Sequence, residues 1–160
     1  APCVLREEVN QYFDLQGESP YMLLVAQVRP ELHCALTAEQ QRLMRDPDLR
    51  KRVNVRRSSL PAITHVDMSA RVQTVDPERH GRFYRLMQEF KRQTGCGVLI
   101  NTSFNIRGEP IVCTPQDACR CFLATDMDML VLEDCLLYKQ EQAKTASTAK
   151  RDYLESFALD

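Results

Sequence analysis

The sequence lacks the features that mark membrane and secreted proteins. It has no apolar run near the ~20 residues that a membrane-spanning helix requires, and the longest run, Tyr21 to Val28, suits a buried strand. No basic segment followed by an apolar stretch opens the chain, which argues against a signal peptide, and no initiator Met is present. We therefore expect a cytoplasmic protein with no membrane association, represented here by an excised piece of a longer chain.

An excess of basic residues is also lacking. The chain has 21 Lys and Arg against 22 Asp and Glu, a formal net charge of -1. Nucleic-acid-binding proteins usually carry a basic excess, because neutralising phosphates supplies most of their non-specific affinity, so nucleic acid is not the expected partner. One local run, Arg50 to Ser59, is rich in Arg and Lys. It fits either an anion or nucleic-acid contact or a solvated, mobile loop, and we favour the loop.

No C-x-x-C pair occurs among the seven cysteines, which are scattered and odd in number. This pattern is typical of reduced thiols in a cytosolic protein. Cys119 and Cys121 lie two residues apart in a predicted helix, where their side chains point to different sides. We therefore interpret the cysteines as small apolar residues, and we expect no metal ligands in this chain.

Two common catalytic patterns are missing as well. The sequence has neither a G-x-S-x-G elbow nor a glycine-rich phosphate loop of the usual types. A hydrolase would have to combine Ser103 with His65 and Asp67. Because His65 and Asp67 would lie on one face of a strand, this triad is disfavoured.

What the chain does contain is enough apolar sequence for one domain with a core, since 44% of its 160 residues are hydrophobic and 27% charged. The clearest helix is predicted from the cap Asp76 to the terminating Gly95. Further helices are expected over 6–13, 37–49 and 114–124, strands over 21–28, 97–100, 127–132 and 135–138, and a polar tail or loose helix over 139–160. Interleaved helices and strands predict an α/β (α+β) domain over 1–138 with a mixed sheet.

Two polar segments are candidate sites. Polar and apolar residues alternate over 62–73. In an extended chain one face would therefore be apolar, and the other would carry His65, Asp67, Ser69, Arg71 and Gln73. A turn or bulge at Ser69 and Ala70 would split this register. The pattern alone fits an anion-binding site or, more simply, a half-exposed strand with one face in contact with solvent.

The second segment, Asn101 to Pro110, follows a buried strand, where ligands of α/β proteins often bind. Two Asn amides, two hydroxyls and Arg107 can donate to phosphate oxygens, and Gly108 lets the backbone bend. A polar turn with Asn capping is the equal alternative.

Both segments together resemble the nodulation and antibiotic O-carbamoyltransferase family. The resemblance covers roughly residues 1–138 and rests on Leu60–Val75 and Asn101–Ala118, supported by Ala1–Glu8 and Ser19–Met22. It implies a C-terminal YrdC-like domain, with a twisted mixed β-sheet and flanking helices. This domain is similar to enzymes that make threonylcarbamoyl-adenylate for tRNA modification.

In that family the YrdC-like domain uses ATP and carbamoyl phosphate to form carbamoyl-adenylate. A larger N-terminal domain, absent from this sequence, holds iron and transfers the carbamoyl group to a hydroxyl of a sugar or antibiotic. The YrdC-like hallmark is K-x-R followed by S-x-N. Ser103–Asn105 matches the second half, whereas the first half would lie upstream of Ala1, and Met68 stands where the family usually has Gly.

The resemblance implies a set of site residues. Ser103, Asn105 and Arg71 are the expected catalytic residues, and Asn101, Thr102, Arg107 and His65 are expected to contact phosphate or carbamoyl groups. The implied ligands are ATP with magnesium, carbamoyl phosphate and, through the N-terminal domain, a hydroxyl acceptor; iron belongs to that domain alone. The alternatives are an RNA-binding module, based on Arg50–Arg57, and a docking module without catalysis.

Overall fold

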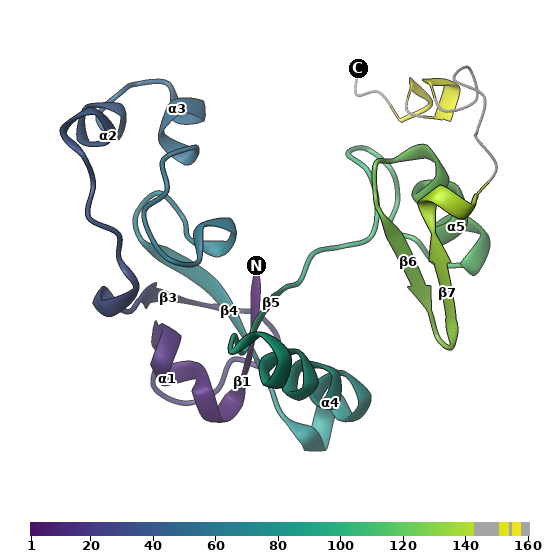
Figure 1. The fold of residues 1–160 in the computed structure, drawn as a ribbon, viewed down its shortest axis with the longest axis horizontal. Coiled ribbons are helices and arrows are strands. Elements are labelled where there is room, and N and C mark those ends of the chain that lie inside the picture. Colours follow the sequence, from purple (N-terminus) through teal and green to yellow (C-terminus); the bar gives the residue numbers. More distant parts are fainter. Residues whose placement is uncertain (143–150, 154, 158–160) are drawn as a thin grey trace. The chain divides into compact units, whose positions relative to one another are not determined.

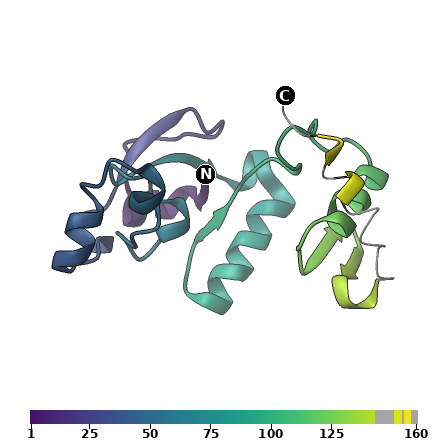
Figure 2. The same ribbon diagram turned by 90° about the horizontal axis from the view of Figure 1, so that it is seen from above.

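A computed structural model describes residues 1–142, 151–153 and 155–157 of the chain (Figures 1 and 2). The chain divides into two compact units, Ala1–Thr102 and Ser103–Asp160. Each unit has its own hydrophobic core.

The first unit is built on a five-stranded sheet in the order β2-β3-β4-β1-β5. The strands are β1 (Pro2–Leu5), β2 (Phe13–Asp14), β3 (Leu24–Val28), β4 (Ser69–Val75) and β5 (Val98–Ile100). The central pair β1 and β4 is parallel, and the other neighbours are antiparallel. The mixed sheet with flanking helices that the sequence predicted is therefore confirmed.

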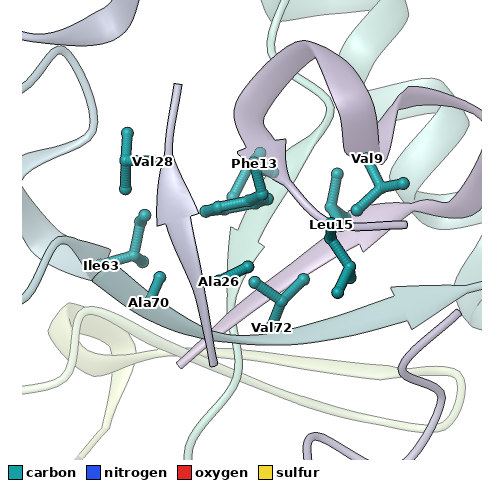
Figure 3. Close-up of a cluster of buried hydrophobic side chains, with 10 residues drawn as sticks. Val9, Phe13, Leu15, Ala26, Val28, Ile63, Ala70 and Val72 are labelled. Atoms are coloured by element: carbon teal, nitrogen blue, oxygen red, sulfur yellow. The ribbon is translucent and has the colours of Figure 1, made fainter. Parts of the chain in front are cut away.

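One face of this sheet carries the larger core. Ala70 and Val72 of β4 lie on the same side as Phe13 and Leu15, which follow the first helical turns of the chain (Figure 3). The whole cluster consists of Val4, Val9, Phe13, Leu15, Ala26, Val28, Ile63, Ala70, Val72 and Val98. Alternate residues of β4 thus meet the core, as period-two patterning predicts.

The long helix α4 (Pro77–Thr94) covers part of the opposite face (Figures 1 and 2). Its buried Met87 packs with Cys3, Leu5 and Val75. The predicted ends are confirmed, because the Asp76 carboxylate accepts a hydrogen bond from the Arg79 N–H and Gly95 ends the helix in the left-handed conformation.

The remainder of that face is not covered by α4. It consists of Val25, Gln27, Arg71 and Gln73, which we call the open face. Val25 is 61% exposed, and Arg71, its partner across the β3–β4 pair, is also exposed. The sheet therefore presents a strip with polar side chains beside its apolar half.

Several short helices differ from expectation. The segment 6–13 forms a 3-10 turn, η1 (Arg6–Glu8), and one turn of helix, α1 (Val9–Tyr12). Of the helix expected over 37–49, only α2 (Ala38–Leu43) forms. Pro47 ends the helical stretch, as expected of a proline, and a separate helix, α3 (Leu49–Val53), follows with Asp48 as its cap. The remaining 3-10 turns of this unit are η2 (Pro30–Leu32) and η3 (Pro61–Ile63).

The second unit packs the helix α5 (Pro115–Ala124) against a hairpin of β6 (Met129–Leu132) and β7 (Cys135–Tyr138). Ala118, Phe122 and Leu130 are its buried centre. A capping box between Thr114 and Asp117 begins α5 where the sequence predicted. Of the segment expected as a tail or loose helix, Lys139–Glu141 form the 3-10 turn η4 and 151–153 are helical, while 143–150, 154 and 158–160 lie outside the described residues. In the part of the chain that is described, no helix is both long and apolar enough to cross a membrane.

The strand expected over 62–73 begins only at Ser69. Residues 65–68 form a turn instead, in which the Met68 N–H donates to the His65 carbonyl at 3.1 Å. Met68 closes this turn with φ at 66°, in the left-handed region that costs a residue with a Cβ roughly 1–2 kcal/mol. The alternation predicted from residue 65 is therefore correct only from residue 69 onward.

Replacing Met68 by Gly should stabilise the chain by about 0.5–1 kcal/mol, because glycine adopts this conformation without strain and part of the gain is offset by its greater freedom when unfolded. The urea midpoint at constant m-value measures the change. The control is Met68→Ala, which keeps the Cβ and should show no gain. Equal midpoints for the glycine and alanine variants would contradict strain as the cause.

Candidate functional site

Arg71 is the exposed cation of the open face. It lies in the middle of β4, between the two strands β3 and β1. Within the described residues, no carboxylate or carbonyl pairs with its guanidinium. A guanidinium held on a rigid strand without a partner has five N–H donors available for an anionic ligand.

Next to Arg71 on the same face, Gln73 binds the start of the second sequence segment. Its Oε1 accepts hydrogen bonds from the Asn101 amide at 2.7 Å and from the Cys3 thiol at 3.0 Å, and its Nε2 donates to the Pro20 carbonyl. Asn101 also pairs through its backbone with Ala1. Burial raises the pKa of the Cys3 thiol, which favours the protonated sulfur that donates this hydrogen bond.

The turn before β4 holds a chain of three side chains. The Ser69 hydroxyl, in a residue only 2% exposed, donates to Asp67 Oδ1 at 2.7 Å and lies 3.0 Å from His65 Nδ1. The Ser69 N–H donates to the same carboxylate oxygen. These two donors hold the pKa of the Asp67 carboxyl below its usual range. His65 and Asp67 therefore bond to Ser69, and the disfavoured triad with Ser103 finds no support.

Arg57 supports this turn from inside the protein, which the sequence did not predict. It is 5% exposed, and its guanidinium donates to the carbonyls of Arg52, Val55 and Thr64. Thr64 immediately precedes His65. The expectation of a solvated loop is therefore wrong for Arg57, whose side chain ties the basic run to the turn. Burial lowers its pKa, and its Nε is left without a partner in the described structure.

The second segment continues into the second unit, where Asn105 organises the loop. Its amide nitrogen donates to the carbonyls of Ile106 and Glu109, at 3.0 and 2.9 Å. The Glu109 carboxylate in turn accepts from the Ile106 N–H at 2.9 Å. The Asn105 donors are thus already engaged, and this residue shapes the loop directly.

Ser103 and Arg107, in contrast, are exposed residues of the second unit, while Thr102 is exposed at the end of the first. No hydrogen bond to any of the three side chains is found among the described residues. The expected site residues thus fall into two sets, His65, Arg71, Asn101 and Thr102 in one unit and Ser103, Asn105 and Arg107 in the other. Their convergence on one ligand stays a prediction.

Contact between the C-terminal segment and the candidate loop could not be predicted from the sequence. Tyr153 donates a hydrogen bond to Glu109, and Phe157 lies against Gly108. Burial, followed by the bond to Glu109, raises the pKa of Tyr153 above its ordinary range. A cavity of about 290 Å³ lies between this segment and the start of α5, lined by Glu109, Pro110, Ile111, Val112, Cys113, Asp117, Arg120, Tyr153 and Phe157.

No cluster of three or more His, Cys, Asp or Glu side chains that could hold a metal ion occurs in the ranges 1–142, 151–153 and 155–157.

Comparison with known proteins places these features in a family. The family model described as "Carbamoyltransferase C-terminus" matches residues 1–139. An uncharacterized protein of Synechocystis, sll1178, is 54% identical over the whole chain, which covers 25% of that protein.

Two relatives have descriptive names. The nodulation protein NolNO of Sinorhizobium fredii is 35% identical over 88% of the chain and 18% of its own length. The 3'-hydroxymethylcephem-O-carbamoyltransferase of Amycolatopsis lactamdurans is 35% identical over 70% of the chain and 16% of its own length. The chain thus spans a quarter or less of the length of these relatives.

Replacing Arg57 by Met should destabilise the first unit by about 1–3 kcal/mol, because three carbonyls, two of them in buried hydrogen bonds, lose their donor while the aliphatic volume is largely kept. The control is Arg56→Met at an exposed position, which should change the free energy of unfolding by less than about 0.5 kcal/mol. Urea unfolding measures both. Equal losses of unfolding free energy in the two variants would show that the hydrogen bonds from Arg57 to these carbonyls do not stabilise the unit.

Replacing Gly108 by Ala should release the C-terminal segment. Gly108 has φ at 86°, and a Cβ there would collide with the Phe157 carbonyl oxygen. Limited trypsin digestion should therefore cleave faster after Arg151, by roughly 10-fold for each 1.4 kcal/mol of docking energy lost. Gly17→Ala, at φ 87° with open space around it, adds comparable strain without a collision and should leave that cleavage rate unchanged. Equal acceleration by both variants would refute the docking.

Proposed function

This chain belongs to the carbamoyltransferase C-terminus family, and on that premise we propose that it binds ATP and carbamoyl phosphate and forms carbamoyl-adenylate. The carbamoyl group would then pass to a hydroxyl acceptor in the N-terminal part of the complete protein. Relatives whose names describe a nodulation protein and a cephem O-carbamoyltransferase support the class of reaction.

The proposed reaction has two steps. Water first cleaves carbamoyl phosphate to carbamate and inorganic phosphate. A carbamate oxygen then attacks the α-phosphorus of ATP, the bond to the β-phosphate oxygen breaks, and pyrophosphate leaves with that electron pair. Such phosphoryl-centre chemistry depends mainly on positioning and on stabilising the charge that develops.

The observation that carries the proposal is the exposed Arg71 on the open face, two residues from Gln73, which fixes the amide of Asn101. The guanidinium can hold two phosphate oxygens at once, and the Asn101 amide, held by Gln73, is proposed to make a further contact. Ser103 and Arg107 are proposed as further donors to the phosphates. Asn105 is proposed to act by shaping the loop that carries them, since its own donors are engaged.

The RNA-binding alternative has less support from the described residues. Its basic run does not form one set of free cations: Arg57 is buried, Lys51 pairs with Asp46, and Arg50, although exposed, pairs with Asp48. A phosphate backbone needs free cations on a common surface. If the chain serves only as a docking module, replacing Arg71 should not change turnover. If Arg71 binds the substrates, the same replacement should slow the reaction.

Changing Arg71 to Ala should reduce carbamoyl-phosphate-dependent exchange of pyrophosphate into ATP by about 10- to 100-fold, the effect of losing a charge-assisted contact. Arg71→Lys should recover only part, because an ammonium group cannot bind two oxygens in the same fork. The measurement uses the complete protein to which this chain belongs.

The matched control is Arg85→Ala, which removes an exposed arginine from α4 without touching the open face. It should leave the exchange rate unchanged. Normal exchange in the Arg71→Ala protein would favour a docking role, and absence of exchange in the unaltered protein would exclude the proposed reaction.

A further inference from the structure

The candidate loop of the second unit ends in a tight turn. The Glu109 N–H donates to the Ile106 carbonyl at 3.1 Å, across a four-residue turn with Arg107 and Gly108 in the middle. Gly108 has φ at 86°, the left-handed conformation that the third position of many tight turns requires. Arg107 is exposed, so the conformation of this turn sets the position of a proposed phosphate donor.

Glu109 joins this turn to the C-terminal segment. Its Oε2 accepts a hydrogen bond from the Ile106 N–H at 2.9 Å, and its Oε1 accepts one from the Tyr153 hydroxyl. The buried Cys121 of α5 lies nearby, since the charge of Glu109, after burial, raises the pKa of the Cys121 thiol. The bond between Tyr153 and Glu109 is therefore partly shielded from water, which strengthens a hydrogen bond to a carboxylate.

A second contact lies one residue earlier in the turn. The backbone carbonyl of Phe157 lies so close to Gly108 that a Cβ on this glycine would collide with it. The rings of Tyr153 and Phe157 pack edge to face, with centroids 5.3 Å apart, so the two contacts belong to one ordered piece of chain. We call residues 151–153 and 155–157 the strap. It lies outside the residues 1–139 that the family model matches.

The places that the strap contacts decide its effect on the loop. It contacts Gly108 and Glu109, whereas no hydrogen bond joins it to Ser103 or Arg107 in the part of the chain that the structure describes, and both of these donors are exposed. A segment that blocked the donors would have to bury them. The strap therefore supports the turn from the side opposite to the exposed donors. Without it the turn would keep only bonds within the loop itself, and such local structure opens readily.

We propose that the strap holds the turn 106–109 in the conformation that positions Arg107 for phosphate, so that docking of the strap and binding of ATP strengthen each other. Tyr153 and Glu109 are positioning residues, because they act through the turn. Coupling of this kind is reciprocal, so each event must favour the other by the same factor. The inference rests on the proposed function, which supplies ATP, whereas the contact between strap and turn rests on geometry alone.

The first experiment tests the support of the turn without any ligand. Tyr153→Phe keeps the ring and removes the hydroxyl that bonds to Glu109. Deuterium exchange of the peptide 104–109, measured by mass spectrometry in the complete protein, should become about 10-fold faster. The control is Tyr21→Phe, which removes a hydroxyl from a residue that is 73% exposed in the first unit and should leave this exchange unchanged. Equal exchange in Tyr153→Phe and the unaltered protein would overturn the inference.

The second experiment measures the coupling to ATP, which a purely structural role of Tyr153 would not produce. The dissociation constant for ATP with magnesium, titrated in the complete protein, should rise about 5- to 10-fold in Tyr153→Phe. Conversely, saturating ATP should slow trypsin cleavage after Arg151 in the unaltered protein by a similar factor. Cleavage after the exposed Arg50 of the first unit, followed in the same digest, shows whether ATP affects the protease itself and should not change.

The outcomes separate this inference from the proposed function. The same dissociation constant for ATP in Tyr153→Phe and the unaltered protein, or the same cleavage rate after Arg151 with and without ATP, overturns the inference and leaves the proposed function standing. Failure of the unaltered protein to bind ATP overturns both.

Discussion

Strand β4 has to satisfy two environments at once, and the candidate site depends on how it does so. Ala70 and Val72 enter the core, so Arg71 and Gln73 must point to the other face. The helix α4 covers only the end of that face around Val75. A one-residue slip of the strand would bury the guanidinium and expose the core, so the large cost of that slip fixes the register. The position of the cation is thus a consequence of packing on the far side of the sheet.

A structural feature could be predicted from the sequence where neighbouring residues determine it, and could not be predicted where distant contacts do. Helix ends with local signals, such as the Asp76 cap and the Gly95 stop, are correct because neighbouring residues decide them. The predicted alternation of polar and apolar faces is wrong before Ser69. Such alternation requires an extended backbone, and Met68 has a left-handed conformation. Arg57 and Tyr153 could not be predicted, since their partners are carbonyls or a carboxylate chosen by tertiary folding. A basic run or a polar tail looks the same in sequence whether or not such partners exist.

The candidate residues also divide by how they are held. Asn101 is tied to Gln73 and to the backbone of Ala1, so the point at which the chain leaves the first unit is fixed. Beyond it, Asn105 and Glu109 close their own loop with bonds that do not involve the sheet. The segment 101–110 therefore has two halves, Asn101 in the first unit and the Asn105–Glu109 loop in the second, and separate hydrogen bonds stabilise each half. A substitution in one half should therefore leave the hydrogen bonds of the other half in place.

The turn that precedes β4 is held by hydrogen bonds within five residues. Ser69 is buried and gives its single hydroxyl proton to Asp67, so its oxygen can offer only a lone pair to His65 Nδ1. The Ser69 N–H donates to the same carboxylate oxygen, and the Met68 N–H donates to the His65 carbonyl. Because both ends of the turn are bonded in this way, Met68 is kept in its costly left-handed conformation. The strand and the turn therefore support each other: β4 places Ser69, and Ser69 orders the side chains of Asp67 and His65.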